Sequence, residues 1–170
     1  MPKVATTTED LATRIIAAFD GLDPPADGEL LHPECMDDVD ILEFYGGVKW
    51  HEMTDQMIIY NYAAPTAFSA KAFQYYLPAY LIWTLLNSDS REYASESILL
   101  ALDPGTSKEM LHEFRKSKFN QLTPAQKEAV LRFLYFFSDH PDLGEFAESA
   151  LVNYWIDQGV RSPGRRFLRI

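Results

Sequence analysis

One stretch of this chain, AFQYYLPAYLIWTLL (Ala72–Leu86), constrains the possible folds more than any other part of the sequence. Its apolar residues lie on every side of a helix, and a helix that is apolar all round belongs in the interior of a protein. The stretch contains Gln74 and Thr84, and it is shorter than the roughly 20 apolar residues that span a bilayer. We therefore predict the central helix of an all-α, single-domain bundle, and no contact with a membrane.

Pro78 interrupts this predicted helix. Proline lacks the N–H that would bond to the carbonyl of Gln74, and its ring crowds that carbonyl, so we expect the helix to bend or restart there. In a structural interpretation, the bend lets the helix pack against neighbours that are not collinear. In a functional interpretation, Gln74 and the hydroxyls of Tyr75, Tyr76 and Tyr80 line a small polar pocket. Buried phenols need hydrogen-bond partners in either case, so the structural interpretation requires no ligand.

Helical spacing of apolar residues continues through most of the remaining chain, and strand signals are scarce. Thr123, Pro124 and Gln126 form a capping-box pattern, which is the clearest helix start in the sequence. MIIYNY (Met57–Tyr62) has a composition that suits either a helix or a strand. The other predicted helices cover Thr8–Phe19, a short element from Asp37 to Gly46, Ala70–Leu86 after a Ser69 cap, Ser90–Leu102, Thr106–Phe119 and Pro141–Gln158.

These signals predict one domain over residues 1–170, built from about six or seven helices around the Pro78 helix. Apolar residues make up 47% of the chain, which is enough for one full-sized core. Beyond Gly159 no apolar stripe continues, so we expect residues from about 160 to 170 to form a loosely held tail. The tail is basic, because it carries Arg161, Arg165, Arg166 and Arg169 and no acidic residue.

Negative charge is concentrated in the first part of the chain. Residues 1–60 hold 13 acidic residues against three basic ones, which accounts for the whole net charge of −10. Such a surface repels phosphate groups and disfavours nucleic acid as a partner. The acidity either keeps the surface solvated or docks a basic protein partner. The candidate partner-binding residues are Asp37, Asp38, Asp40 and Glu43, on a predicted helix whose Ile41, Leu42 and Phe44 point inward.

No constellation of reactive residues stands out. His32-Pro33-Glu34-Cys35 has a metal-like spacing, but it falls short of the four protein ligands of a structural zinc site. The sequence has no G-x-S-x-G elbow, zincin histidine pair, EF-hand loop or glycine-rich phosphate loop. We therefore expect no catalytic residues, no metal and no cofactor. A small-molecule site or an enzyme with a tyrosine-lined pocket near Pro78 is the alternative.

YYLPAYL (Tyr75–Leu81), LTPAQKEAVLRFL (Leu122–Leu134) and AESALVNYW (Ala147–Trp155) resemble a bacterial family of small, uncharacterised proteins known only as a domain of unknown function. The resemblance spans roughly Trp50–Trp155, rests on packing residues, and implies a helical fold and a bacterial origin.

The chain has a single cysteine, and its acidic N-terminal segment lacks the basic and long apolar regions of a secretory signal peptide. Both features favour a cytoplasmic location. We expect a non-catalytic protein-binding module, such as an immunity-type or inhibitor protein, that docks a basic partner through an acidic N-terminal face.

Overall fold

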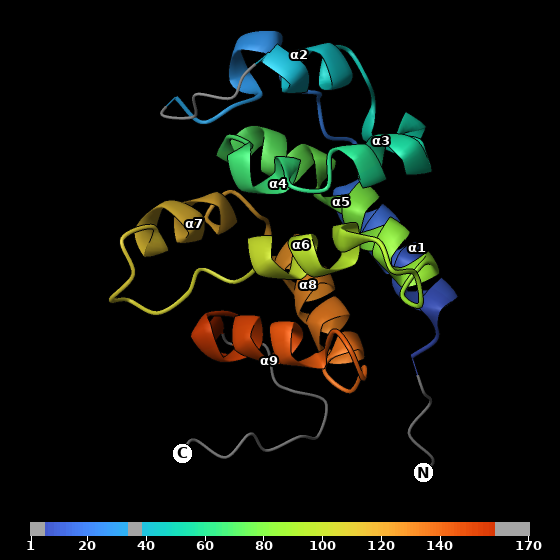
Figure 1. Ribbon diagram of the computed structural model, residues 1–170, viewed down its shortest axis with the longest axis vertical. Coiled ribbons are helices and arrows are strands. Elements are labelled where there is room, and N and C mark those ends of the chain that lie inside the picture. The colour runs from blue at the N-terminus through green and yellow to red at the C-terminus, as the bar shows by residue number, and fades with distance from the viewer. Residues whose placement is uncertain (1–5, 34–38, 159–170) are drawn as a thin grey trace.

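The computed structural model describes residues 6–33 and 39–158, and this part of the chain forms nine α-helices, three 3-10 helical turns and no strand. The predicted all-α fold is confirmed. Figure 1 shows α2 at one end of the long axis and α9 at the other, with α5 and α6 between them.

In chain order the α-helices are α1 (Thr8–Phe19), α2 (Val39–Tyr45), α3 (Asp55–Tyr60), α4 (Ala64–Ala67), α5 (Ala70–Leu86), α6 (Tyr93–Ala101), α7 (His112–Phe119), α8 (Pro124–Phe137) and α9 (Gly144–Asn153). The 3-10 turns are η1 (Asp27–Glu29), η2 (Trp50–Glu52) and η3 (Trp155–Gln158). The number exceeds the predicted six or seven because α3 and α4 are separate short helices. The segment that suited a helix or a strand is therefore mainly helical.

α5 is the central helix, as predicted. Twelve of its 17 residues are buried, on all sides of the helix. It packs against α1, α6 and α7, and the Ser69 hydroxyl caps its start by accepting the N–H of Ala72 at 3.0 Å. The helix runs through Pro78 without a break, so it does not restart there. Its uniform burial explains how a proline is tolerated, because packing on all sides holds the helix around one missing hydrogen bond.

Local capping chemistry sets several helix starts where the sequence predicts them. The Thr7 hydroxyl accepts the N–H of Asp10 at 3.1 Å and begins α1. At α8, Thr123 N–H donates to Gln126 Oε1 at 3.0 Å, and Gln126 N–H donates to Thr123 Oγ1 at 3.3 Å. The predicted capping box is therefore present.

The helix predicted over Thr106–Phe119 is shorter than expected, because α7 begins only at His112. The Glu109 carboxylate accepts the N–H of Thr106 at 2.9 Å. This side chain thus supports a local turn after Gly105, which adopts a φ of +72°. A side chain that bonds nearby backbone competes with the helical hydrogen-bond ladder.

The last predicted helix is also divided. α9 starts at Gly144 because His140 Nδ1 accepts the N–H groups of Asp142 and Leu143, at 3.2 and 3.3 Å. α9 ends at Asn153, and the backbone continues as η3, in which the indole of Trp155 donates to the carbonyl of Leu102 at 2.8 Å. A hydrogen bond to a distant segment therefore holds the chain just after the C-terminal end of α9. The predicted basic tail lies outside the described residues.

Three elements converge on the C-terminal half of α5. α1 packs against α5 and α8, while η2 and α3 pack against α5. A backbone bridge between Leu31 and Phe68 ties the loop after α1 to the start of α5. Among the described helices, none is both long enough and apolar enough to cross a membrane.

Candidate functional site

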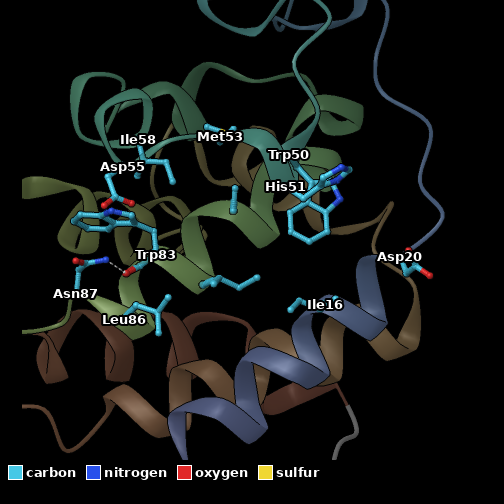
Figure 2. Close-up of a pocket in the computed structure, with 12 residues that line it drawn as sticks. Ile16, Asp20, Trp50, His51, Met53, Asp55, Ile58, Trp83, Leu86 and Asn87 are labelled. Carbon is cyan, nitrogen blue, oxygen red and sulfur yellow. Dashed lines mark hydrogen bonds between the residues drawn. The ribbon is translucent and has the colours of Figure 1, made fainter.

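The strongest candidate site is a groove of about 460 Å³ between α1, η2, α3 and α5, called here the tryptophan groove. Figure 2 shows Trp83, Asp55 and Asn87 toward one end and Trp50, His51 and Asp20 toward the other. Its lining comprises Ile16, Asp20, Trp50, His51, Met53, Asp55, Ile58, Ala79, Ile82, Trp83, Leu86 and Asn87. The groove is therefore apolar along its length, with carboxylates near both ends.

Helix ends shape the groove. α1 ends where Asp20 adopts an extended backbone and Gly21 takes a φ of +74°, which turns the chain away. α3 begins at the Thr54 cap, whose hydroxyl accepts the N–H of Met57 at 3.3 Å. α5 ends at Asn87, whose side chain donates to the carbonyl of Trp83 at 2.9 Å. These three termini place polar residues around the apolar lining that the helices supply.

Trp83 carries an unused hydrogen-bond donor in the groove. Its side chain is 5% exposed, and its indole Nε1 has no hydrogen-bond acceptor in the described part of the chain. Trp155 is also buried, at 1% exposed, and its indole donates to the Leu102 carbonyl at 2.8 Å. A buried polar group without a partner costs about 1–3 kcal/mol. The cost falls on a residue that lines the groove, which makes Trp83 the most informative residue of the site.

The carboxylates of Asp20 and Asp55 lie exposed near the ends of the groove. Neither forms an ion pair with another residue in the described ranges 6–33 and 39–158. At the same end as Asp20, the rings of Trp50 and His51 meet edge to face with centroids 5.5 Å apart.

The ionisable side chains of the groove are Asp20, His51 and Asp55. Its lining contains no serine, threonine, cysteine, lysine or tyrosine, so carboxylates and one imidazole are its potential nucleophiles. Apolar walls with a few polar groups are typical of a binding site.

The predicted tyrosine pocket is occupied by the protein's own backbone. Tyr76 donates its hydroxyl to the carbonyls of Tyr45 and Val48, at 3.0 and 2.8 Å. Tyr80 donates to the carbonyl of Asn61 at 3.0 Å and also bonds the hydroxyl of Tyr45. These hydroxyls join α5 to α2 and to the segment after α3, in agreement with the structural interpretation of buried phenols.

Burial changes the acidity of these phenols. Loss of solvation raises the pKa of Tyr45, Tyr76 and Tyr80 above the ordinary 10.0, with nearby tyrosines adding to the rise in each case. The Tyr45 hydroxyl opposes the rise at Tyr80 by hydrogen bonding. The pKa of Tyr75 is also raised by burial, and a backbone hydrogen bond with Trp50 counteracts it. All four groups are thus held in the neutral form.

Gln74 faces a different neighbour from the tyrosines. Its side-chain amide donates to the carbonyl of Gln121 at 2.9 Å and to Gln126 Oε1 at 2.8 Å. Since Gln126 Oε1 also accepts the N–H of Thr123, this contact joins α5 to the capping box of α8. The structure brings Tyr76 and Tyr80 together and separates Gln74 from them.

The predicted acidic face is described only in part. Asp37 and Asp38 lie outside the described residues, and only the backbone of Asp40 is described, on α2. Glu43 is exposed on α2, while Ile41 on the same helix is 9% exposed. Phe44 is half-buried and contacts the ring of Tyr60, with centroids 5.2 Å apart. The binding role of these four acidic residues stays a prediction.

A second pocket, of about 690 Å³, lies between α6, α7, α9 and the segment before α7. Its acidic groups already hold the local structure. Asp103 accepts hydrogen bonds from Gly105, Ser149 and Asn153, at 2.8, 2.5 and 2.9 Å. Glu109 holds the turn before α7 and contacts Arg115 at 3.4 Å. The polar lining of this pocket is internally paired, unlike that of the tryptophan groove.

The metal-like sequence motif gives no described cluster. His32 packs edge to face on Phe114, with centroids 4.4 Å apart, and Glu34 and Cys35 lie outside the described residues. Within the described part of the chain, no group of three histidine, cysteine or acidic side chains is placed to hold a metal ion.

Sequence reasoning did not identify the groove residues. The sequence predicts Trp83 only as part of the buried helix, and His51 belongs to none of its reactive motifs. Trp50 in the polar context KWHEMTD is the one local signal from which a partly exposed aromatic residue could have been predicted. The convergence of residues 16–20, 50–58 and 79–87 has no marker within any one of these segments.

The family model described as "Family of unknown function (DUF6714)" matches residues 7–159. No curated protein and no solved structure matches the chain.

Proposed function

We propose that this chain, which belongs to the family of unknown function DUF6714, is a non-catalytic binding protein whose tryptophan groove receives a basic segment of a protein partner. The observation that carries the proposal is the groove itself. It combines an apolar lining with exposed carboxylates near both ends, and these form no ion pair within residues 6–33 and 39–158. An apolar segment with cationic flanks complements both features.

The size of the groove suits side-chain recognition. Ligand sites typically enclose about 300–1,000 Å³, and this groove encloses about 460 Å³. Aromatic residues dominate the energetics of protein interfaces, and Trp50 and Trp83 supply two of them here. Partly exposed Ile16 and Leu86, at 48% and 66%, extend the apolar surface at the groove's edge.

Charge supports a basic partner over an acidic one. Asp20 and Asp55 belong to residues 1–60, which carry the whole net charge of −10. A concentrated negative field steers cationic partners and raises their association rate. The predicted residues Asp37, Asp38, Asp40 and Glu43 would add to the same field. In this proposal they steer the partner, and the groove holds it.

A reducing compartment fits a chain with one cysteine, so we propose that this binding takes place in the cytoplasm. The family resemblance supports a bacterial host. A role as an immunity-type or inhibitor protein is one form of this function, because such proteins act by tight binding without catalysis.

The test is selection of random dodecapeptides displayed on phage against the full-length protein. Enriched peptides should combine Arg or Lys with large apolar residues. Titration of nitrogen-15-labelled protein should then shift resonances of Trp50, Trp83 and Ile16. An Asp20→Asn/Asp55→Asn variant should bind the selected peptides about threefold to tenfold more weakly, since each partly exposed ion pair contributes up to about 1 kcal/mol.

The matched control is Glu145→Gln/Glu148→Gln. It removes the same charge from exposed positions of α9. It should leave peptide affinity close to that of the wild type. The proposal fails if selected peptides carry no cationic residues, or if both double variants weaken binding equally.

A further inference from the structure

We propose that the segment bound in the tryptophan groove is an extended, proline-rich peptide with a basic residue at its ends, and that one of its backbone carbonyls accepts the indole N–H of Trp83. This inference rests on the proposed function and specifies its ligand. It begins from a buried donor in the lining that has no acceptor among the described residues, the Nε1 of a side chain only 5% exposed.

The groove offers a donor and few acceptors to a peptide backbone. An indole nitrogen can only donate, so its ligand must bring an acceptor. The acceptors in the lining are on Asp20, Asp55, His51 and Asn87, toward the ends in Figure 2, and the middle of the groove is apolar. A segment with free carbonyls and few N–H groups suits this arrangement. Proline-rich segments have this property, because proline has a carbonyl but no N–H.

Other backbone conformations fit less well. An α-helix uses its interior carbonyls in its own hydrogen bonds, so only its last turn could satisfy the indole. A β-strand binds by pairing with a sheet edge, and the described residues contain no strand to pair with. A polyproline II helix has no internal hydrogen bonds and presents its carbonyls outward. Such segments are recognised by aromatic-lined grooves.

The carboxylates near the ends of the groove indicate which residues the ends of the peptide should carry. Asp55 lies toward the Trp83 end and Asp20 toward the Trp50 end, and neither has an ion-pair partner in the described part of the chain. An arginine at either end of the bound segment can pair with the nearer carboxylate. Because guanidinium groups bind carboxylates through two parallel hydrogen bonds, arginine should be preferred over lysine.

Binding requires a small opening at the Trp83 end. In the free protein the Nε1 atom is closed to solvent, so an acceptor reaches it only after neighbouring side chains move. Figure 2 shows the Asp55 carboxylate and the Asn87 amide on either side of the Trp83 indole. Asp55 is exposed and free to rotate toward a peptide arginine. When the Asp55 carboxylate turns to pair with the peptide arginine, it moves away from the Trp83 indole. The same movement therefore binds the charge and opens the Nε1 atom to a peptide carbonyl.

The experiment compares two blocked synthetic peptides of equal length and charge. The first has arginine at each end of a run of prolines interrupted by leucine, and the second replaces every proline by alanine. We expect the proline peptide to bind about tenfold more tightly, because its conformation is already ordered before binding. In nitrogen-15 spectra it should move the indole N–H resonance of Trp83 downfield, and the Trp155 resonance should stay in place.

The outcomes separate this inference from the proposed function. If both peptides bind equally and both perturb the groove, the proline-specific inference is overturned while the groove remains a binding site. If neither perturbs the groove, both are overturned. Binding of the proline peptide without movement of the Trp83 resonance overturns the hydrogen bond.

A Trp83→Phe variant tests the donor directly, since it keeps an aromatic ring and removes the N–H. It should weaken the proline peptide about threefold to tenfold, the usual effect of one lost hydrogen bond. Its unfolding curve shows whether the variant remains folded. The resonance measurement on the wild-type protein keeps the inference testable if it does not.

Discussion

At the scale of single residues, the hydroxyl of Tyr80 is the clearest example of a polar group that the core depends on. It donates to the Asn61 carbonyl at 3.0 Å and also bonds the hydroxyl of Tyr45. Among the described residues, Tyr80 is the hydrogen-bond partner of the Tyr45 hydroxyl. Tyr80→Phe therefore leaves the buried Tyr45 hydroxyl unpartnered and should lower the free energy of unfolding by about 1–3 kcal/mol. Tyr45→Phe leaves Tyr80 bonded to Asn61 and should cost only about 0.5–1.5 kcal/mol.

Urea denaturation of the two variants, compared at equal m-value, measures this difference. The double variant should lose less than the sum of the single losses, because the two changes share one hydrogen bond. A larger loss for Tyr45→Phe than for Tyr80→Phe contradicts the assignment.

At the scale of elements, the turn between α8 and α9 depends on Gly144, the first residue of α9. A Cβ atom at this position would lie 2.9 Å from the carbonyl oxygen of Ser138, which is backbone and has little freedom to yield. Gly144→Ala should therefore force the two helices apart and lower the free energy of unfolding by about 1–3 kcal/mol. At Gly28 an added Cβ meets nothing within 4 Å, so Gly28→Ala should change stability by less than about 0.5 kcal/mol.

Thermal and urea denaturation of the two alanine variants check this prediction. Equal stability of both would mean that the α8–α9 junction adjusts without cost.

At the scale of the whole molecule, the buried tyrosines predict the response to alkaline pH. Burial raises the pKa of Tyr45, Tyr76 and Tyr80 in the folded state above the ordinary 10.0. Their contribution to stability is therefore complete below pH 10 and is lost as the pH rises above it, because only the unfolded chain then releases their protons. Each tyrosine should lower the free energy of unfolding by about 1.4 kcal/mol per pH unit in that range.

A pH titration that follows helix content and tyrosinate absorbance together tests this. Tyr45, Tyr76 and Tyr80 should ionise together with loss of helicity, and Tyr80→Phe should reduce the slope of stability against pH. Ionisation of all nine tyrosines in a protein that keeps its helicity would contradict the prediction.

The acidic first part of the chain predicts how a partner associates. Asp38→Asn/Asp40→Asn/Glu43→Gln should leave folding nearly intact, since surface changes usually stay within about 0.5 kcal/mol each. Association of a groove-binding basic peptide should become slower and less dependent on salt, because charges beside a binding site mainly steer the encounter. Stopped-flow fluorescence at two salt concentrations measures both effects. An unchanged rate and salt response would show that these acids serve solubility alone.

Helix positions and caps were predictable because they depend on neighbours in sequence. Thr8–Phe19 is helical over the predicted range, and the Ser69 cap and the Thr123 capping box form between residues three positions apart. The apolar run around Pro78 likewise required a buried helix whatever surrounded it. The family match covers residues 7–159, and the motifs that resemble the family lie in the helices that form this core.

The tertiary structure decided what local sequence leaves open. Lys118 is 3% exposed, with its ammonium group bonded to the carbonyls of Pro65 and Thr66 at 3.1 and 2.6 Å and 4.7 Å from the Phe114 ring centroid. Nothing near Lys118 in sequence marks it as buried. The tryptophan groove arises in the same way, because α1, α3 and α5 bring together residues from 16 to 87. The acceptor that Trp155 finds and Trp83 lacks is likewise set by packing between distant segments, since the carbonyl that Trp155 reaches is 53 residues away.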